Sequence, residues 1–260
     1  MSTTDIGWTG VAGALLLIIV ALLLSRLNRL HLEGTIIWSA LRATVQLVVV
    51  GFGLTLVFDA DAPVALALVW VVAMVLVAAL TVRWRAPEVP SAFPLALVAI
   101  AAVAVVSLGT VFGLGVFPVE ARVIIPLAGM NVGNALAATV VVARRVVAEL
   151  RDKRLEIEAR LALGHSGADA TRPYVREAMR TAVLPQIEST KTVGLIALPG
   201  AMTGLILAGV PPRQAVMVQV AVMFLILGSV TTSVVVVCLG LTRRLLTHDH
   251  RLVRLDRVAS

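Results

Sequence analysis

Residues 144–199 read RRVVAELRDKRLEIEARLALGHSGADATRPYVREAMRTAVLPQIESTKTVGLIALP. They form the one long charged run of an otherwise apolar chain and hold ten of its 22 lysine and arginine residues. Apolar runs long enough to cross a membrane precede and follow them. This order indicates a polar segment set between membrane spans.

The composition of the chain is that of an integral membrane protein. Hydrophobic residues make up 59% and charged residues 14% of the 260 residues, and the mean hydropathy is +0.99. Ordinary globular chains contain about 45–50% apolar and about 25% charged residues. The net charge of +7 comes without a basic groove pattern or interleaved aromatic residues. We therefore predict an all-α membrane protein that contacts the lipid bilayer and no nucleic acid.

Seven apolar runs are candidates for membrane-spanning helices, since about 20 residues cross a bilayer. They cover residues 6–24, 40–58, 64–82, 93–116, 123–143, 193–210 and 215–241. Basic residues follow the first run instead of preceding it, so we expect no cleavable signal peptide. We expect a single transmembrane domain over residues 1–260.

The basic residues predict the orientation of these spans. With the N-terminus outside and the C-terminus inside, only Arg122 and Arg213 lie on the outer side, and the cytoplasmic loops hold nearly all the others. The location expected from this is the cytoplasmic, or inner, membrane of a bacterial-type cell. The sixth run contains Pro199, Gly200 and Gly204, so a broken or re-entrant helix is the alternative to a continuous span.

Residues 144–191 are predicted to form a cytoplasmic helical region between the fifth and sixth spans. An apolar stripe extends the fifth span outward through Val146, Leu150, Ile157 and Leu161. Gly164 is suited to end that helix, and Ser166 with Asp169 is typical of the start of a second one. The second stripe consists of Thr171, Val175, Ala178, Met179 and Ala182.

Small residues recur at four-residue spacing in the spans and predict a helix-packing seam. Its members are Gly129, Gly133, Gly200, Gly204 and Ala208. Such rows let helices approach closely in lipid. Packing within one bundle and a dimer face or moving seam remain alternatives.

Few polar residues enter the spans, and they are the candidates for a substrate pathway. Asn131 and Asn134 share a helix face, where they serve either as hydrogen-bonded links between helices or as a hydrophilic lining. Glu188 and Lys191 stand three apart where the polar segment re-enters the membrane, as an interfacial ion pair or as a gate for a cation. Met130 and Met202 lie beside the small-residue seam as filler or as soft ligands.

Several chemistries lack the residues that they need. The spans contain no HExxH metal motif and no nucleophile beside a base, so we do not expect an enzyme. No Asp or Glu lies within the apolar runs, which disfavours a proton-driven secondary transporter. His248 and His250 flank Asp249 in the tail, where solvated side chains are a simpler interpretation than metal ligands. The sequence assigns no metal ligands.

One motif resembles a known coupling element. EARLALG, residues 158–164, is similar to the start of the motif through which ABC importer permeases contact their ATPases, although Leu184 and Pro185 fall later than that motif places its Leu-Pro. The resemblance implies ATPase coupling by Glu158, Ala159, Gly164, His165, Ser166 and Asp169.

A longer resemblance covers nearly the whole chain. The segments RATVQLVVVG, IPLAGMNVGNA, LALGHSGADA and REAMRTAVLPQIESTKTVGLIALPGAMTGLILAGVPP are similar to the Fet-type iron-export permease family, which includes plant aluminium-tolerance relatives. This implies a permease subunit that exports iron as part of an ABC transporter, paired with a separate subunit that binds ATP and Mg²⁺. We hypothesise that the permease is a homodimer. The chain itself has no GxxxxGK[ST] phosphate loop, and we expect no cofactor in it. Another small solute, such as a sugar nucleotide, and a self-sufficient channel or secondary transporter remain alternatives.

Overall fold

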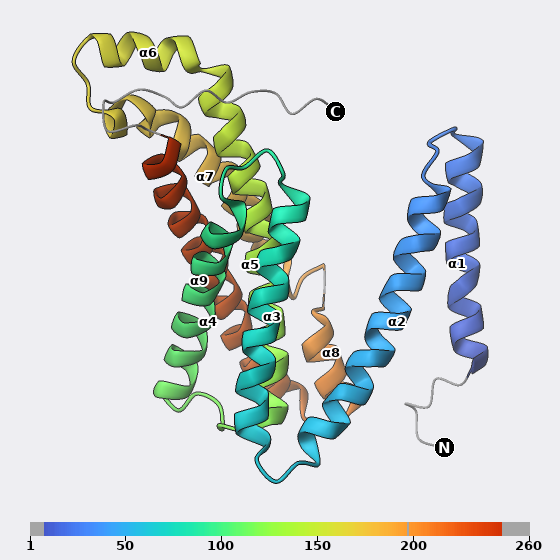
Figure 1. The fold of residues 1–260 in the computed structure, drawn as a ribbon. Coiled ribbons are helices and arrows are strands. Elements are labelled where there is room, and N and C mark those ends of the chain that lie inside the picture. Colours follow the sequence, from blue (N-terminus) through green and yellow to red (C-terminus); the bar gives the residue numbers. More distant parts are fainter. Residues whose placement is uncertain (1–7, 197, 246–260) are drawn as a thin grey trace. The chain divides into compact units, whose positions relative to one another are not determined.

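The computed structural model describes residues 8–196 and 198–245, and every regular element in them is an α-helix (Figure 1). This confirms the predicted fold class. The helices divide into two compact units. The first contains α1 and α2, and the second contains α3 to α7 and α9.

The first unit is a helical hairpin. Helix α1 spans Trp8–Leu27 and α2 spans Glu33–Phe58. A short turn joins them, in which the Ser25 hydroxyl donates to Glu33 Oε1 at 2.9 Å and accepts from the Leu32 amide at 3.2 Å. Most large apolar side chains described in this hairpin are exposed, including Leu17, Leu47 and Phe52. Such a surface is suited to lipid or to a partner helix.

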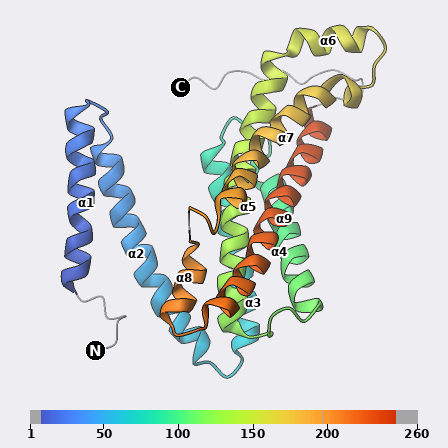
Figure 2. The same cartoon turned by 180° about the vertical axis from the view of Figure 1, so that it is seen from behind.

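The second unit is built around α5, which spans Ala121–Asp152. Helices α4 (Ala92–Gly113), α7 (Gly167–Thr192) and α9 (Pro212–Leu245) each contact it, and α9 also contacts α4 and α7. Figures 1 and 2 show α5 and α9 running in the same direction, with α7 running the opposite way against both. Helix α3 (Pro63–Arg85) reaches α5 through Met74, and the short α6 (Arg154–Ala162) lies at one end.

Small residues set the spacing of these helices. The buried core of the second unit contains many alanines and valines, among them Ala99, Val142 and Val234. Gly240 of α9 lies against Leu95 of α4, where an added Cβ would overlap the Leu95 side chain. Close approach of this kind gives the van der Waals contact that holds helices together in lipid.

Five of the seven predicted apolar runs are helices long and apolar enough to cross a membrane: α2, α3, α4, α5 and α9. The first run corresponds to α1, whose apolar part Leu15–Leu27 is shorter. The sixth run does not form one continuous helix, because residues 193–196, 198 and 199 are non-helical and α8 (Gly200–Leu207) has only eight residues. The structure therefore contains a broken helix, with the break near Pro199. The reason is local, since Gly194 has φ +86° and proline lacks the amide proton that a helix needs.

Candidate functional site

The elbow, residues 153–178, is where the chain leaves α5, turns through α6 and enters α7. The predicted continuous helix from the fifth span is interrupted at Lys153, which has φ −97° and ψ 17°. Ile157 of α6 is fully buried and belongs to the same core as Val146 and Leu150. The predicted stripe is therefore correct as a buried face, although it continues across two helices.

Local chemistry fixes the turn between α6 and α7 as predicted. Gly164 has φ +91°, the left-handed conformation in which glycine ends helices, and its amide donates to the Leu161 carbonyl at 3.0 Å. Ser166 caps α7, because its Oγ accepts from the Asp169 amide at 3.1 Å. The Ser166 hydroxyl also donates to Asp169 Oδ2 at 2.6 Å. The two helices consequently meet at a defined angle and not through a loose loop.

Tyr174 ties α7 to α6. Its hydroxyl donates to Glu156 Oε2 at 2.9 Å, and the Arg160 guanidinium lies 5.8 Å from the centre of its ring. Hydrogen bonds from Lys153 and Tyr174 lower the pKa of Glu156, while burial and the bond to Glu156 raise the pKa of Tyr174. The ionised carboxylate of Glu156 is therefore the form that accepts the hydrogen bond from Tyr174 and links α6 to α7. Protonation of Glu156 at low pH would weaken this contact.

The predicted coupling residues gather on the outer side of this elbow. Every one is exposed, and Glu158 additionally pairs with Arg154 across 2.7 Å. They are Glu158, Ala159, Gly164, His165, Ser166 and Asp169.

Two residues of the elbow were missed by the sequence reasoning. Leu155 is 81% exposed and Leu163 is 80% exposed, and they flank Ala159 at four-residue spacing. Helix α6 is thus apolar on its outer face as well as on the buried Ile157 face. Leu155, Ala159 and Leu163 have the i, i+4, i+8 spacing of one helix face, so the sequence contained the signal. The prediction assigned the apolar face of this helix to the buried stripe through Ile157 instead.

Helix α7 carries the Glu188 and Lys191 pair back along the bundle. Lys191 Nζ lies 2.8 Å from Glu188 Oε1, and both side chains are more than half exposed. Glu188 lies fourteen residues after Tyr174, which is about 21 Å along the helix. Helix α7 contacts both α5 and α9.

The other pathway candidates separate into two environments. Asn131 is fully buried, and its Oδ1 accepts from the Ser229 hydroxyl of α9 at 2.6 Å. Asn134 and Met130 are half-buried on α5, and Met202 is half-buried on α8. The Nδ2 of Asn134 donates to the Met130 carbonyl at 2.8 Å. Within the described residues, no hydrogen bond joins the Glu188 pair to either asparagine.

The predicted small-residue seam shows one close approach. An added Cβ at Gly129 would lie 3.6 Å from Met74 Cε of α3. At Gly133, Gly200 and Gly204 a Cβ would meet no atom within 4 Å, and Ala208 is exposed.

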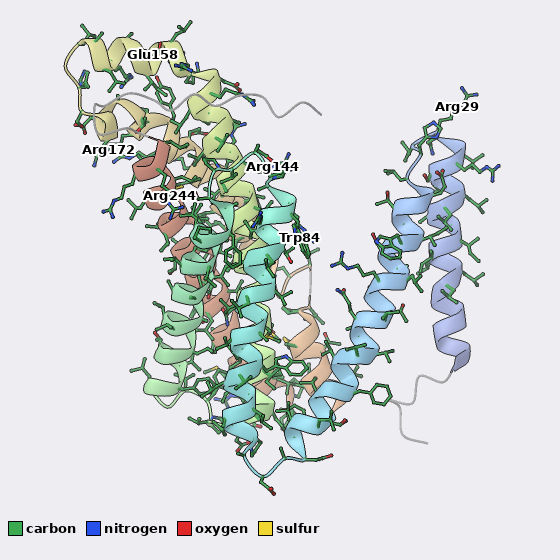
Figure 3. All side chains as sticks on the ribbon, viewed as in Figure 1. Arg29, Trp84, Arg144, Glu158, Arg172 and Arg244 are labelled. Carbon is green, nitrogen blue, oxygen red and sulfur yellow. The ribbon has the colours of Figure 1, made fainter. Side chains whose placement is uncertain are left out.

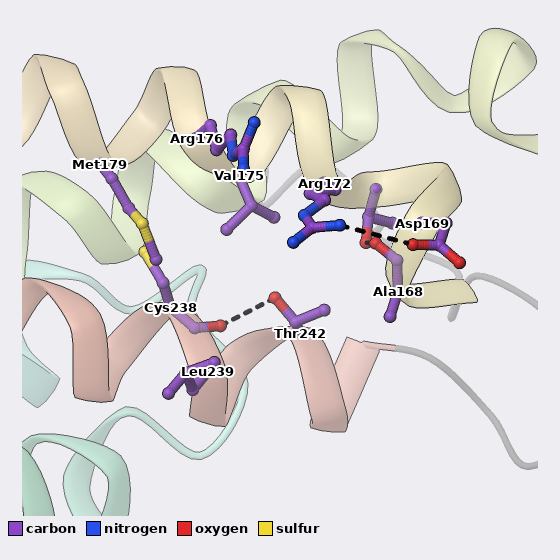
Figure 4. A pocket seen from close by; sticks show the side chains of 10 residues that line it. Ala168, Asp169, Arg172, Val175, Arg176, Met179, Cys238, Leu239 and Thr242 are labelled. Carbon is purple, nitrogen blue, oxygen red and sulfur yellow. Dashed lines mark hydrogen bonds and ion pairs between the residues drawn. The ribbon is translucent and has the colours of Figure 1, made fainter. Parts of the chain in front are cut away.

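Cavities and metal-binding groups complete the inventory. A cavity of about 470 Å³ lies between α7 and α9, with Arg172 at its rim and Met179 and Leu239 in its wall (Figure 4). In residues 8–196 and 198–245, no three His, Cys, Asp or Glu side chains gather as a metal site. His248 and His250 lie outside the described residues.

Comparison with known proteins identifies relatives over nearly the whole chain. It is 33% identical over 253 residues to the "Probable iron export permease protein FetB" of Escherichia coli, covering 97% of each chain. It is 39% identical over 228 residues to the "UPF0014 membrane protein STAR2" of Oryza sativa subsp. japonica, covering 88% of this chain and 80% of that one. It is 37% identical over 227 residues to the "Protein ALUMINUM SENSITIVE 3" of Arabidopsis thaliana, covering 87% and 83%. No solved structure matches the chain.

A family model described as "Uncharacterised protein family (UPF0014)" matches residues 8–246. This match and the relatives in bacteria and plants agree with the membrane-spanning helices and the predicted resemblance. The chain belongs to the UPF0014 family of multi-pass membrane proteins.

Proposed function

We propose that this chain is the permease subunit of an ABC transporter that exports iron or a related metal species from the cytoplasm, using ATP hydrolysed by a separate subunit. The bacterial relative named as a probable iron export permease supports the transported substrate, since the two chains match over 97% of their lengths. We further propose that the permease works as a homodimer in the bacterial cytoplasmic membrane, with ATP and Mg²⁺ held only by the partner.

The observation that carries the partnership is the outer face of α6. Leu155 and Leu163 are about four-fifths exposed in a part of the chain rich in charged residues. Exposed apolar patches with a polar rim mark sites of contact with a protein or a membrane, and we propose a protein here. The same face presents Ala159 and the exposed carboxylate of Glu158, so an ATP-binding subunit would find an apolar centre with a charged rim.

The elbow also supplies a route for mechanical coupling. Helix α6 is fastened to α7 through Tyr174 and to α5 through buried Ile157. Helix α7 in turn contacts both α5 and α9. A displacement of α6 by an ATPase would therefore be transmitted to two spans as rigid-body tilt, which is a common form of switching in packed helices.

Disrupting the outer face of α6 tests this proposal. We expect the double variant Leu155→Glu, Leu163→Glu to lose at least about tenfold in affinity for the proposed ATP-binding subunit, because apolar anchors dominate such interfaces. Affinity is measured by co-purification and titration in detergent. The control Arg176→Gln changes an exposed residue of α7 and should retain binding. Full binding by the double variant, with its helical content intact, would contradict the docking site.

Transport itself is measured in inside-out vesicles that contain both subunits. ATP-dependent uptake of Fe²⁺ is expected, and vesicles with the permease alone should show none. Uptake by the permease alone would favour a channel or secondary transporter. Uptake of a sugar nucleotide in place of a metal would retain the ABC assignment and replace the substrate.

A further inference from the structure

Hydroxyl side chains in apolar helices normally donate a hydrogen bond to a backbone carbonyl of the preceding turn, and several threonines of this chain do so. Thr44, Thr81 and Thr231 each donate to the carbonyl four residues earlier, at 2.7–3.0 Å. Such a bond satisfies the hydroxyl without a partner from another helix. A buried hydroxyl that does not make this backbone bond needs another hydrogen-bond partner.

Three hydroxyls between α4 and α9 do not make this backbone bond. Ser107, Thr110 and Thr232 make no side-chain hydrogen bond with any described residue, and the Ser107 Oγ is buried. Ser107 itself is only 6% exposed. Thr110 is exposed and Thr232 is half-buried, so the unpaired hydroxyl that burial makes unfavourable is that of Ser107, and it points to a polar partner in the adjoining space.

These three hydroxyls line one cavity together with Ser229. It encloses about 180 Å³ between α4 and α9, and its remaining walls include Val103, Phe224 and Gly228. Ser229 uses its proton on Asn131, which leaves its oxygen lone pairs available to a donor in the cavity. The space is large enough for several water molecules, each of which occupies about 30 Å³ in the liquid.

The cavity reaches the middle of the membrane layer. Ser229 lies sixteen residues after Arg213 and fourteen before Arg243, or about 24 Å and about 21 Å along α9. Thr110 lies three residues before Gly113, the last residue of α4, or about 5 Å from the end of that helix. The hydroxyls therefore extend inward from the end of α4 toward the buried Asn131.

We propose that Ser107, Thr110, Ser229 and Thr232 form an uncharged, water-filled crevice that enters from the C-terminal end of α4 and reaches the centre of the bundle. Water supplies the hydrogen-bond partner that the buried Ser107 hydroxyl lacks and also hydrates Thr110 and Thr232. No charged side chain lines it, so it stabilises water and neutral polar groups and gives a bare metal cation no counter-charge. The inference requires only that the chain spans a membrane and does not depend on the proposed ATPase partner.

Cysteine accessibility tests the crevice in the full chain reconstituted in lipid nanodiscs, where both membrane faces are open. In a Cys238→Ala background, the variants Ser107→Cys and Thr232→Cys differ little in volume from the natural residues. A hydrophilic methanethiosulfonate reagent requires a thiolate, which forms in water and not in hydrocarbon. We expect both cysteines to react on the order of tenfold faster, or more, than matched controls in lipid.

The controls are Val105→Cys and Val235→Cys, which replace exposed apolar residues of α4 and α9 close to the two test positions. Equal rates at test and control positions, or no reaction at either test position, would overturn the proposal. Covalent dimers formed by oxidising a Gly228→Cys variant, with Thr232→Cys unreactive, would also overturn it, because a second copy of the chain would then cover a dry seam.

Discussion

The Glu188 and Lys191 pair shows at the scale of single residues why position along a helix matters. Both side chains are more than half exposed, on a helix that contacts the apolar spans α5 and α9. A charge pair facing hydrocarbon is costly, so this face of α7 requires water or protein beside it.

Neutralising Glu188 should expose its contribution to transport. If this carboxylate meets the cation inside the membrane layer, Glu188→Gln reduces ATP-dependent Fe²⁺ uptake into inside-out vesicles by about tenfold or more, since the attraction is strong at low dielectric. The matched variant Glu177→Gln alters an exposed acid near the start of α7 and should transport normally. ATPase activity and assembly should stay unchanged in both. Normal uptake with Glu188→Gln would remove this residue from the pathway.

At the scale of elements, the elbow is a rigid corner made from two short-range motifs. Gly164 follows α6 in a left-handed conformation. Ser166 caps the start of α7, because its side chain accepts a hydrogen bond from the Asp169 amide. An added Cβ at Gly164 would meet no atom within 4 Å, so any cost of substitution there arises from the backbone and not from crowding.

Substitution at Gly164 should separate coupling from assembly. Gly164→Val forces a β-branched residue into the left-handed region, at a cost of about 1–2 kcal/mol, and should loosen the corner. Gly164→Asn should be tolerated, because asparagine adopts this conformation readily. We expect the valine variant to lose ATPase stimulation in the reconstituted complex and to be cleaved faster by trypsin within residues 153–178. Identical behaviour of the two variants would show that the corner geometry is unimportant for coupling.

At the scale of the molecule, charge is distributed unevenly along the second unit. Figure 3 shows Arg144, Glu158, Arg172 and Arg244 toward the end that carries α6. The opposite end carries Glu120, Arg122 and Arg213 near the starts of α5 and α9. Basic residues concentrate on the cytoplasmic side of membrane proteins, so this asymmetry supports an elbow in the cytoplasm.

Single cysteines on the two ends test this orientation in intact cells. In the Cys238→Ala background, Val119→Cys in the α4–α5 turn should react with a membrane-impermeant maleimide added outside. Ser166→Cys in the elbow should react only after the membrane is permeabilised. The reverse pattern would place the elbow outside the cytoplasm and contradict both the topology and the ATPase partnership.

Much of the fold and part of the site could be predicted because the signals were local. Apolar runs of about 20 residues defined α2, α3, α4, α5 and α9, and a capping pattern marked the start of α7. The break at Lys153 escaped prediction, since its neighbours Leu150 and Ile157 keep helical spacing across it. Packing of Ile157 into the core overrode that local continuity.

The sequence by itself determined the membrane class, the helical content, the glycine and serine motifs of the elbow and the family. These depend on hydrophobicity and on hydrogen bonds between near neighbours, which the order of residues specifies directly. Only the tertiary structure paired Asn131 with Ser229, exposed Leu155 and Leu163, and brought Ser107 beside Thr232. Those relations join residues far apart in the chain, and they depend on how each helix is rotated against its neighbours.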